Sequence, residues 1–167
     1  MAISFLSFGF SGSRVSGSAP SALASVVVSA VAPCGVVSCG CARGVDAVVR
    51  PFASSIFRVS SFGVGRGAFA RRSIAFVSAL ASSPDPVLFC FPLGLCPAPL
   101  VPSASPSACF AGFGSGSWAS AAFAVGLGVP VVVFGVDYSD LPASWRSLFL
   151  FWRPVVVGGV AGFVLGG

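Results

Sequence analysis

Apolar residues in this chain gather in short runs separated by segments in which apolar and small residues recur at helical spacing. Mainly apolar runs of about four to eight residues are typical of strands buried on both faces of a sheet. We expect strands over residues 3–8, 36–39, 56–60, 87–91 and 129–136. The segments between them predict helices over residues 20–31, 45–53, 68–82 and 117–127.

This alternation of strands and helices predicts an α/β protein, a three-layer Rossmann-like fold with a mainly parallel sheet. A chain of 167 residues is long enough for one domain with a buried core. Residues 92–108 hold five Pro and three Ser without periodicity, which predicts a long irregular loop. We assign residues 1–136 to the Rossmann-like domain. Residues 137–167 form a C-terminal apolar extension of ambiguous structure, with a helical turn near 141–149 and a final strand or tail.

Three turns rich in glycine and serine, residues 9–14, 40–46 and 114–120, each lie between an apolar segment and a predicted helix. Such a turn presents backbone N–H groups at the positive end of the helix dipole, where a phosphate binds well. Because parallel strands end at one edge of a sheet, we expect the three turns to meet there. Each is also consistent with an ordinary strand-to-helix turn. The candidate ligand-binding residues in these turns are Ser11, Gly12, Ser13, Gly40, Gly44, Gly114, Ser115, Gly116 and Ser117.

The composition excludes several classes of catalytic and metal site. The chain has no His, Lys, Glu, Gln, Asn or Thr, so a Ser/His/Asp triad and a His-containing metal site are impossible. The missing residues have adenine-rich codons, and a spurious reading frame is one alternative. The six cysteines contain no Cys-x-x-Cys pair, which argues against zinc and thioredoxin-like sites and favours buried reduced thiols over disulfides. We expect neither a metal nor a cofactor.

The charged residues favour an anionic partner. The net charge is +5, and all positive side chains are Arg, which binds phosphate in a fork geometry. Arg71 and Arg72 are adjacent in a predicted helix, so at most one of them would face a ligand squarely. Asp46 is either a ligand-binding group or a helix cap and partner of Arg43. Trp118 either stacks on a base or packs against the 92–108 loop. The candidate ligand-binding residues with charged or aromatic side chains are Arg14, Arg43, Asp46, Arg71, Arg72 and Trp118.

The mean hydropathy of +1.00 raises the alternative of a small membrane protein. The two longest apolar runs are residues 121–136 and 148–165, and both are interrupted by Gly and Pro. Such runs fit buried strands better than a bilayer span. We therefore expect a cytoplasmic protein without a membrane partner.

With these motifs in view, the chain resembles the Smf/DprA and Lonely Guy (SLOG) superfamily of Rossmann-like nucleotide-binding domains. Residues 10–14, Phe-Ser-Gly-Ser-Arg, look like the Ser-Gly-Ser-Arg element after that family's first strand. Residues 38–47 are similar to the Ser-Gly-x-Ala-x-Gly-Ile-Asp-Ala motif of DNA-processing protein A. The Arg71-Arg72 pair resembles the Arg-Lys or Arg-Asn pair before the fourth strand. Residues 114–133 look like the last phosphate loop, helix and strand, so the resemblance covers about residues 3–136.

The resemblance implies that residues 1–136 bind a nucleotide. Lonely Guy enzymes carry a catalytic Glu where this chain has Ser120 or Ala121, so we expect binding without catalysis. The expected ligand is a nucleotide, a nucleotide-derived small molecule or a nucleic-acid phosphate, with single-stranded nucleic acid and a second copy of the chain as further candidate partners. The enzyme alternative is a phosphoribohydrolase that acts on nucleoside monophosphates through Asp46.

Overall fold

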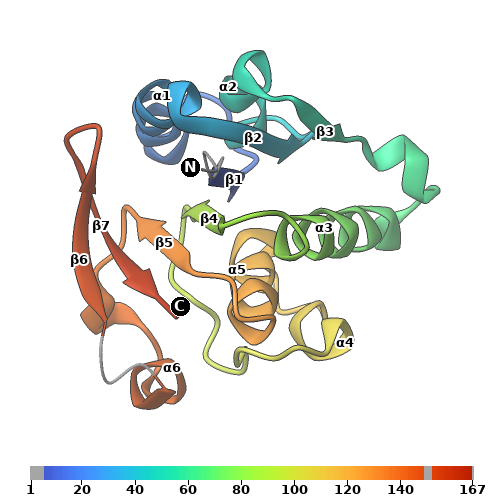
Figure 1. Ribbon diagram of the computed structural model, residues 1–167. Helices are drawn as coiled ribbons and strands as arrows, with labels where there is room; N and C mark the ends of the chain where they lie inside the picture. Colours follow the sequence, from blue (N-terminus) through green and yellow to red (C-terminus); the bar gives the residue numbers. More distant parts are fainter. Residues whose placement is uncertain (1–5, 149–151, 167) are drawn as a thin grey trace.

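A seven-stranded sheet forms the centre of the molecule (Figure 1). The computed structural model describes residues 6–148 and 152–166. The strand order is β3-β2-β1-β4-β5-β7-β6, in which β3 to β5 run parallel and β7 runs antiparallel to β5. The strands are β1 (Leu6–Gly12), β2 (Gly35–Gly40), β3 (Ser55–Phe57), β4 (Pro86–Phe91), β5 (Val131–Phe134), β6 (Arg153–Val157) and β7 (Val160–Leu165).

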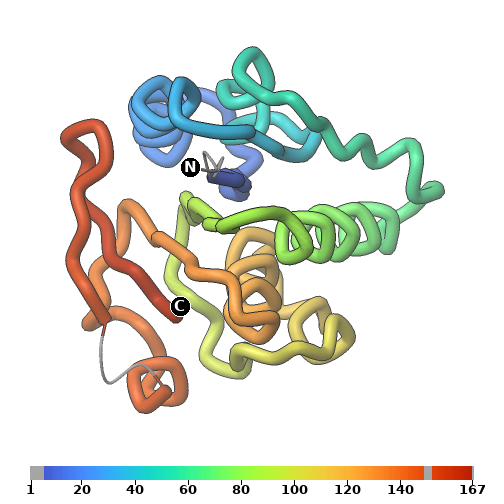
Figure 2. Tube along the Cα trace, in the orientation of Figure 1, coloured from blue at the N-terminus to red at the C-terminus, as the bar shows by residue number. Residues whose placement is uncertain are grey.

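Helices cover both faces of this sheet, which confirms the predicted three-layer Rossmann-like fold with a mainly parallel sheet. Helices α1 (Ala19–Val31) and α2 (Val45–Val49) pack on one face, and α3 (Arg66–Ala81) and α5 (Gly116–Gly126) pack on the other. Of the two short helices, α4 (Pro106–Cys109) lies beside α5, and α6 (Ala143–Leu148) precedes the last two strands along the chain (Figures 1 and 2). Single 3₁₀ turns occupy Ala32–Cys34, Arg50–Phe52, Val59–Phe62 and Tyr138–Asp140.

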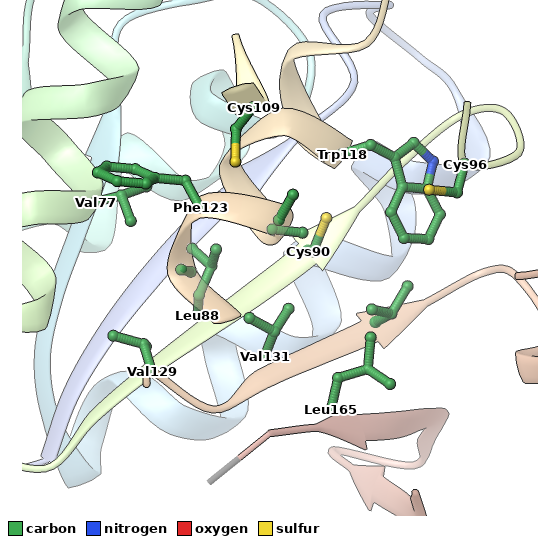
Figure 3. Close-up of a cluster of buried hydrophobic side chains, with 14 of the residues drawn as sticks. Val77, Leu88, Cys90, Cys96, Cys109, Trp118, Phe123, Val129, Val131 and Leu165 are labelled. Carbon is green, nitrogen blue, oxygen red and sulfur yellow. The ribbon is translucent and has the colours of Figure 1, made fainter. Parts of the chain in front are cut away.

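Alternate residues of the central strands supply two separate cores, because successive side chains of a strand point to opposite faces. On the α1 face, Phe10 stacks on Phe91 at 6.0 Å between ring centroids, and Phe91 stacks on Phe134 at 4.9 Å. On the α5 face, Leu88 and Cys90 of the same strand β4 belong to a second buried cluster, which includes Trp118 and Phe123 of α5 (Figure 3). The sheet is thus buried on both sides, as continuous apolar strands predict.

Strand β1 runs further than the sequence indicates, so the prediction of a turn beginning at Gly9 is wrong. Residues Gly9 and Gly12 both belong to the strand, and only residues 13–18 connect it to α1. Side chains of α3 press on Gly9, where an added Cβ would lie 2.5 Å from Cδ2 of Leu80. Glycine is therefore present because a helix packs closely there and not because the chain turns. Residues 3–5 of the predicted strand lie outside the described residues.

The 92–108 segment is largely irregular, as expected, and ends in the single turn of α4. The apolar residues 109–113 that follow are not a strand: they are the last residue of α4 and a bend in which Gly112 has a φ of +85°. The turn before α5 consequently does not follow a strand directly. Two tryptophan side chains anchor the segment, since Nε1 of Trp118 donates to the Gly94 carbonyl and Nε1 of Trp145 donates to the Leu100 carbonyl.

The C-terminal residues extend the same sheet. Strands β6 and β7 form a hairpin joined by Gly158 and Gly159, whose φ values of +59° and +84° suit a two-residue turn. Residues 162–165 of β7 pair with the whole of β5. The predicted helical turn near 141–149 corresponds to α6, with residue 149 outside the described residues. Within residues 6–148 and 152–166, none of the helices has the length and apolar character needed to cross a bilayer.

Candidate functional site

A cavity of about 950 Å³ opens at the carboxyl ends of β1 and β4. Strand β2 pairs with β1 on one side, and β4 pairs with β1 on the other side. The strand order therefore reverses at this edge of the sheet. Ligands of open α/β sheets bind at such a point. The cavity brings together ten of the predicted site residues: Ser11, Gly12, Ser13, Arg14, Asp46, Arg72, Gly114, Ser115, Gly116 and Ser117.

The other predicted residues lie outside the cavity lining. Arg71 points away, and its Nε donates to the Phe62 carbonyl at 2.8 Å. Trp118 is 1% exposed and packs edge-to-face on Trp145, so of its two predicted roles the structure shows packing. Arg43 is exposed on the loop between β2 and α2.

Gly40 and Gly44 allow neighbouring residues of the site to pack closely. A Cβ on Gly40 would overlap the guanidinium of Arg72 and lie 2.5 Å from the carboxylate of Asp46. Gly44 has a φ of +69° and lets its loop approach the backbone of Ser13, whose carbonyl accepts from the Val45 amide at 3.0 Å. Both glycines therefore act through close packing and conformation.

A buried ion pair forms the floor of the cavity. Oδ2 of Asp46 lies 3.3 Å from Nη1 of Arg72 and accepts a hydrogen bond from the Ala42 amide at 3.0 Å. Asp46 is therefore paired with Arg72, and the predicted alternative of a pair with Arg43 is wrong. Burial raises the pKa of the Asp46 carboxyl above its ordinary value, although Arg72 acts in the opposite direction. Among the described residues, Nε of Arg72 is buried without a hydrogen-bond partner.

Two further residues of α3 reach the cavity, and sequence reasoning missed both. Arg66 and Phe69 line it together with Arg72, at intervals of three residues along one face of the helix. This spacing is readable in the sequence and could have identified them. The guanidinium carbon of Arg14 lies 4.4 Å from the centroid of the Phe69 ring, and that of Arg72 lies 5.6 Å from it.

The start of α5 also lines the cavity. Ser115 caps the helix, and its Oγ accepts from the Trp118 amide at 3.3 Å. The amides of Gly116 and Ser117 have no acceptor within the helix, as in the first turn of any helix. An added Cβ on Gly116 would meet nothing within 4 Å, so its backbone faces open space.

The backbone amide of Ser13 is engaged within the protein, which corrects its predicted role as an N–H donor to a ligand. It donates to the Phe91 carbonyl at 3.0 Å and so continues the pairing of β1 with β4. The Oγ of Ser13 accepts from the Val15 amide at 3.1 Å. Its hydroxyl proton is the donor that Ser13 can offer to a ligand.

Apolar side chains also line the cavity. Leu93 and Leu95 are 57% and 64% exposed, and Phe110 and Phe113 contribute aromatic edges. No sequence pattern identifies these residues as part of a site, because they lie in the irregular segment between β4 and α5. The cavity thus pairs a cationic, hydrogen-bonding part with an apolar part.

The cysteines take no part in disulfides, and four of the six are buried: Cys39, Cys90, Cys96 and Cys109. Burial raises the pKa values of Cys39 and Cys96 to about 12, so these thiols are protonated at neutral pH. Cys109 lines the cavity, and burial raises its pKa too. In the part of the chain that the structure describes, no cluster of three His, Cys, Asp or Glu side chains could hold a metal ion.

Comparison of the chain with protein-family models, with curated proteins and with solved structures found no match. The resemblance to the Smf/DprA and Lonely Guy superfamily therefore rests on the sequence motifs described above and stays a prediction.

Proposed function

We propose that this protein binds a nucleotide or nucleotide-derived ligand through its phosphate group, without transforming it. One observation carries the proposal: Arg14 and the N-terminal turn of α5 line a single cavity at the strand-order reversal. A guanidinium and a helix N-terminus are both donors to phosphate oxygens, and together they suit a group with several acceptors.

The charges around the cavity support an anionic ligand. Arg14, Arg66 and Arg72 line it against one carboxylate, Asp46, which is already paired with Arg72. Arg14 is exposed and forms no ion pair within the described residues. In the proposed complex, the phosphate accepts hydrogen bonds from Arg14, from the amides of Gly116 and Ser117, and from the Ser115 hydroxyl.

The positions of the polar groups favour binding over hydrolysis. Asp46 is 5% exposed and held by Arg72 and the Ala42 amide, so it is poorly placed to attack or protonate a glycosidic bond. Ser120 and Ala121, the two positions where the Lonely Guy pattern could place its Glu, are both buried, and Ser120 donates its hydroxyl proton to the Gly116 carbonyl. The phosphoribohydrolase alternative predicts release of free base from a nucleoside monophosphate.

The proposal is tested by thermal unfolding with adenosine 5′-monophosphate, adenosine and a 5′-phosphorylated oligonucleotide. A monophosphate at about 100 times its dissociation constant stabilises the fold by roughly 2.7 kcal/mol, and adenosine should do much less. The oligonucleotide shows whether a strand end also delivers its phosphate to the site. Arg14→Ala should remove most of the gain, whereas Arg153→Ala on the edge strand β6, outside the cavity lining, should leave it unchanged.

Equal stabilisation by adenosine and by its monophosphate would refute a phosphate-centred site. Chromatography of the incubated monophosphate should recover it intact. Adenine among the products would show that the protein is a hydrolytic enzyme.

A further inference from the structure

We infer that Phe69 is a positioning residue that holds the guanidinium of Arg14 at the cavity before a ligand arrives, an inference that rests on the proposed phosphate site. The Arg14 guanidinium carbon lies 4.4 Å from the centroid of the Phe69 ring, well within the range of cation–π attraction. Both residues line the cavity, yet they come from the loop after β1 and from α3.

Arg14 needs such a partner because its guanidinium forms no hydrogen bond or ion pair with the described residues. It is exposed, and it belongs to the connection between β1 and α1. A free Arg side chain loses rotamer entropy when it is immobilised by a ligand, and this loss weakens binding. An aromatic face that already orders the guanidinium reduces this loss.

The ring itself is well placed to act as a support. Phe69 is half-buried on α3, one turn after Arg66 and one turn before Arg72, so the helix fixes its position. Its centroid also lies 5.6 Å from the guanidinium carbon of Arg72. One neutral ring therefore attracts two cations that repel each other.

An aromatic partner differs from a carboxylate in the charge that it leaves at the site. Asp46 orients Arg72 but also neutralises it. Phe69 orients Arg14 and leaves its positive charge available to an anion, because the ring attracts the cation through a quadrupole and carries no net charge. The two Arg residues are thus held by different means, and Arg14 is the one that keeps its full charge for the ligand.

The test compares Phe69→Leu with Phe69→Tyr, using inorganic phosphate and adenosine 5′-monophosphate as separate probes in calorimetric titrations. Phe69→Leu keeps most of the apolar volume and removes the aromatic face, so it should weaken binding of both probes by about two- to fivefold. Phe69→Tyr should bind like the wild type. Phe52→Leu, which alters an exposed phenylalanine outside the cavity lining, is the matched control.

Two further measurements separate positioning from a general structural effect. In NMR spectra without ligand, the Arg14 side-chain N–H resonance should lose its ring-current shift in Phe69→Leu and keep it in Phe69→Tyr. In a double-mutant cycle, Phe69→Leu should cost nothing further once Arg14 is already Ala.

Each other outcome overturns the inference in a distinct way. Weaker binding of the nucleotide alone would show that the ring stacks on the base. Unchanged affinity for both probes, or additive losses in the cycle, would show that Phe69 does not act through Arg14. If the wild type binds neither probe, the proposed function falls and this inference falls with it.

Discussion

At the scale of single residues, the most consequential feature is the pair formed by Asp46 and Arg72. Asp46 is 5% exposed, and burial raises the pKa of its carboxyl even though the Arg72 guanidinium lies 3.3 Å away. Removing a charge from water thus outweighs its attraction to one partner, as is common for buried ion pairs. The direction of this pKa shift fixes how the stability of the fold depends on pH.

Because the folded-state pKa of Asp46 is raised, the protonated form stabilises the fold at low pH, and this contribution is lost as the pH rises through the folded-state pKa. Asp46→Asn stays neutral and can still accept from Arg72 and Ala42. We expect the free energy of unfolding of the wild type, relative to that of Asp46→Asn, to fall as the pH is raised from about 3 towards neutrality. Urea unfolding of both proteins across this range measures the difference, and a rise would mean that Arg72 dominates instead.

At the scale of elements, the N-terminus of α5 is the part of the site most open to a steric test. The Gly116 backbone faces open space, so a valine side chain there fits the fold but fills the approach to the helix amides. We expect Gly116→Val to weaken binding of adenosine 5′-monophosphate at least tenfold, because hydrogen bonds to charged groups contribute about 1.5–3 kcal/mol.

Calorimetric titration measures this loss, and thermal unfolding without ligand checks that the fold is intact. Ala143→Val places the same side chain at the exposed first position of α6, away from the cavity, and should leave the affinity unchanged. Full affinity in a folded Gly116→Val protein would show that the loop before α5 only turns the chain.

At the scale of the whole molecule, the charges are divided unequally along the chain. Residues 14–72 hold seven Arg and one Asp, whereas the remaining residues hold two Arg and three Asp. The net charge of +6 in the first group belongs to the loops and helices around β1, β2 and β3, and the rest of the chain carries −1. The cavity therefore lies beside the basic half of the sheet.

This distribution predicts a strong dependence of binding on salt. Raising NaCl from about 0.05 to 0.5 M shortens the Debye length to below about 5 Å and should weaken binding of adenosine 5′-monophosphate severalfold. Binding of adenosine, which carries no charge, should change little over the same range. Titrations at four salt concentrations measure both trends, and parallel curves would argue that charge plays no part in recognition.

Much of this architecture could be predicted from the sequence because the five parallel strands are mainly apolar runs separated by segments with helical spacing. The glycines were harder to interpret. Gly9 was expected in a turn because glycine is common there, yet its role depends on Leu80, which is remote in sequence. The hairpin of β6 and β7 did have a local signal, since Gly158-Gly159 between two valine-rich runs is a pair that favours a two-residue turn.

The candidate site was foreseeable where its residues follow strands and unforeseeable where tertiary packing selects them. Residues 11–14 follow from the position of β1, whereas the choice between Arg71 and Arg72 depends on how α3 rotates against the sheet. Leu93 and Leu95 come from a segment without periodicity, and tertiary contacts, among them the hydrogen bonds from two tryptophan side chains, place it beside the cavity.

The pairing of β1 with β4 also sets a constraint on how the chain acquires its structure during synthesis. Ser7 pairs with Pro86, so the central strand must wait for a partner that is translated about 80 residues later. At about 5–20 residues per second, this interval lasts roughly 4–16 s on the ribosome. During that time Phe8 and Phe10 can pack against α1 and β2 but lack Phe89 and Phe91 of β4. The nascent chain is thus most exposed to aggregation in its first half, and the cavity forms only after β4 has closed the sheet.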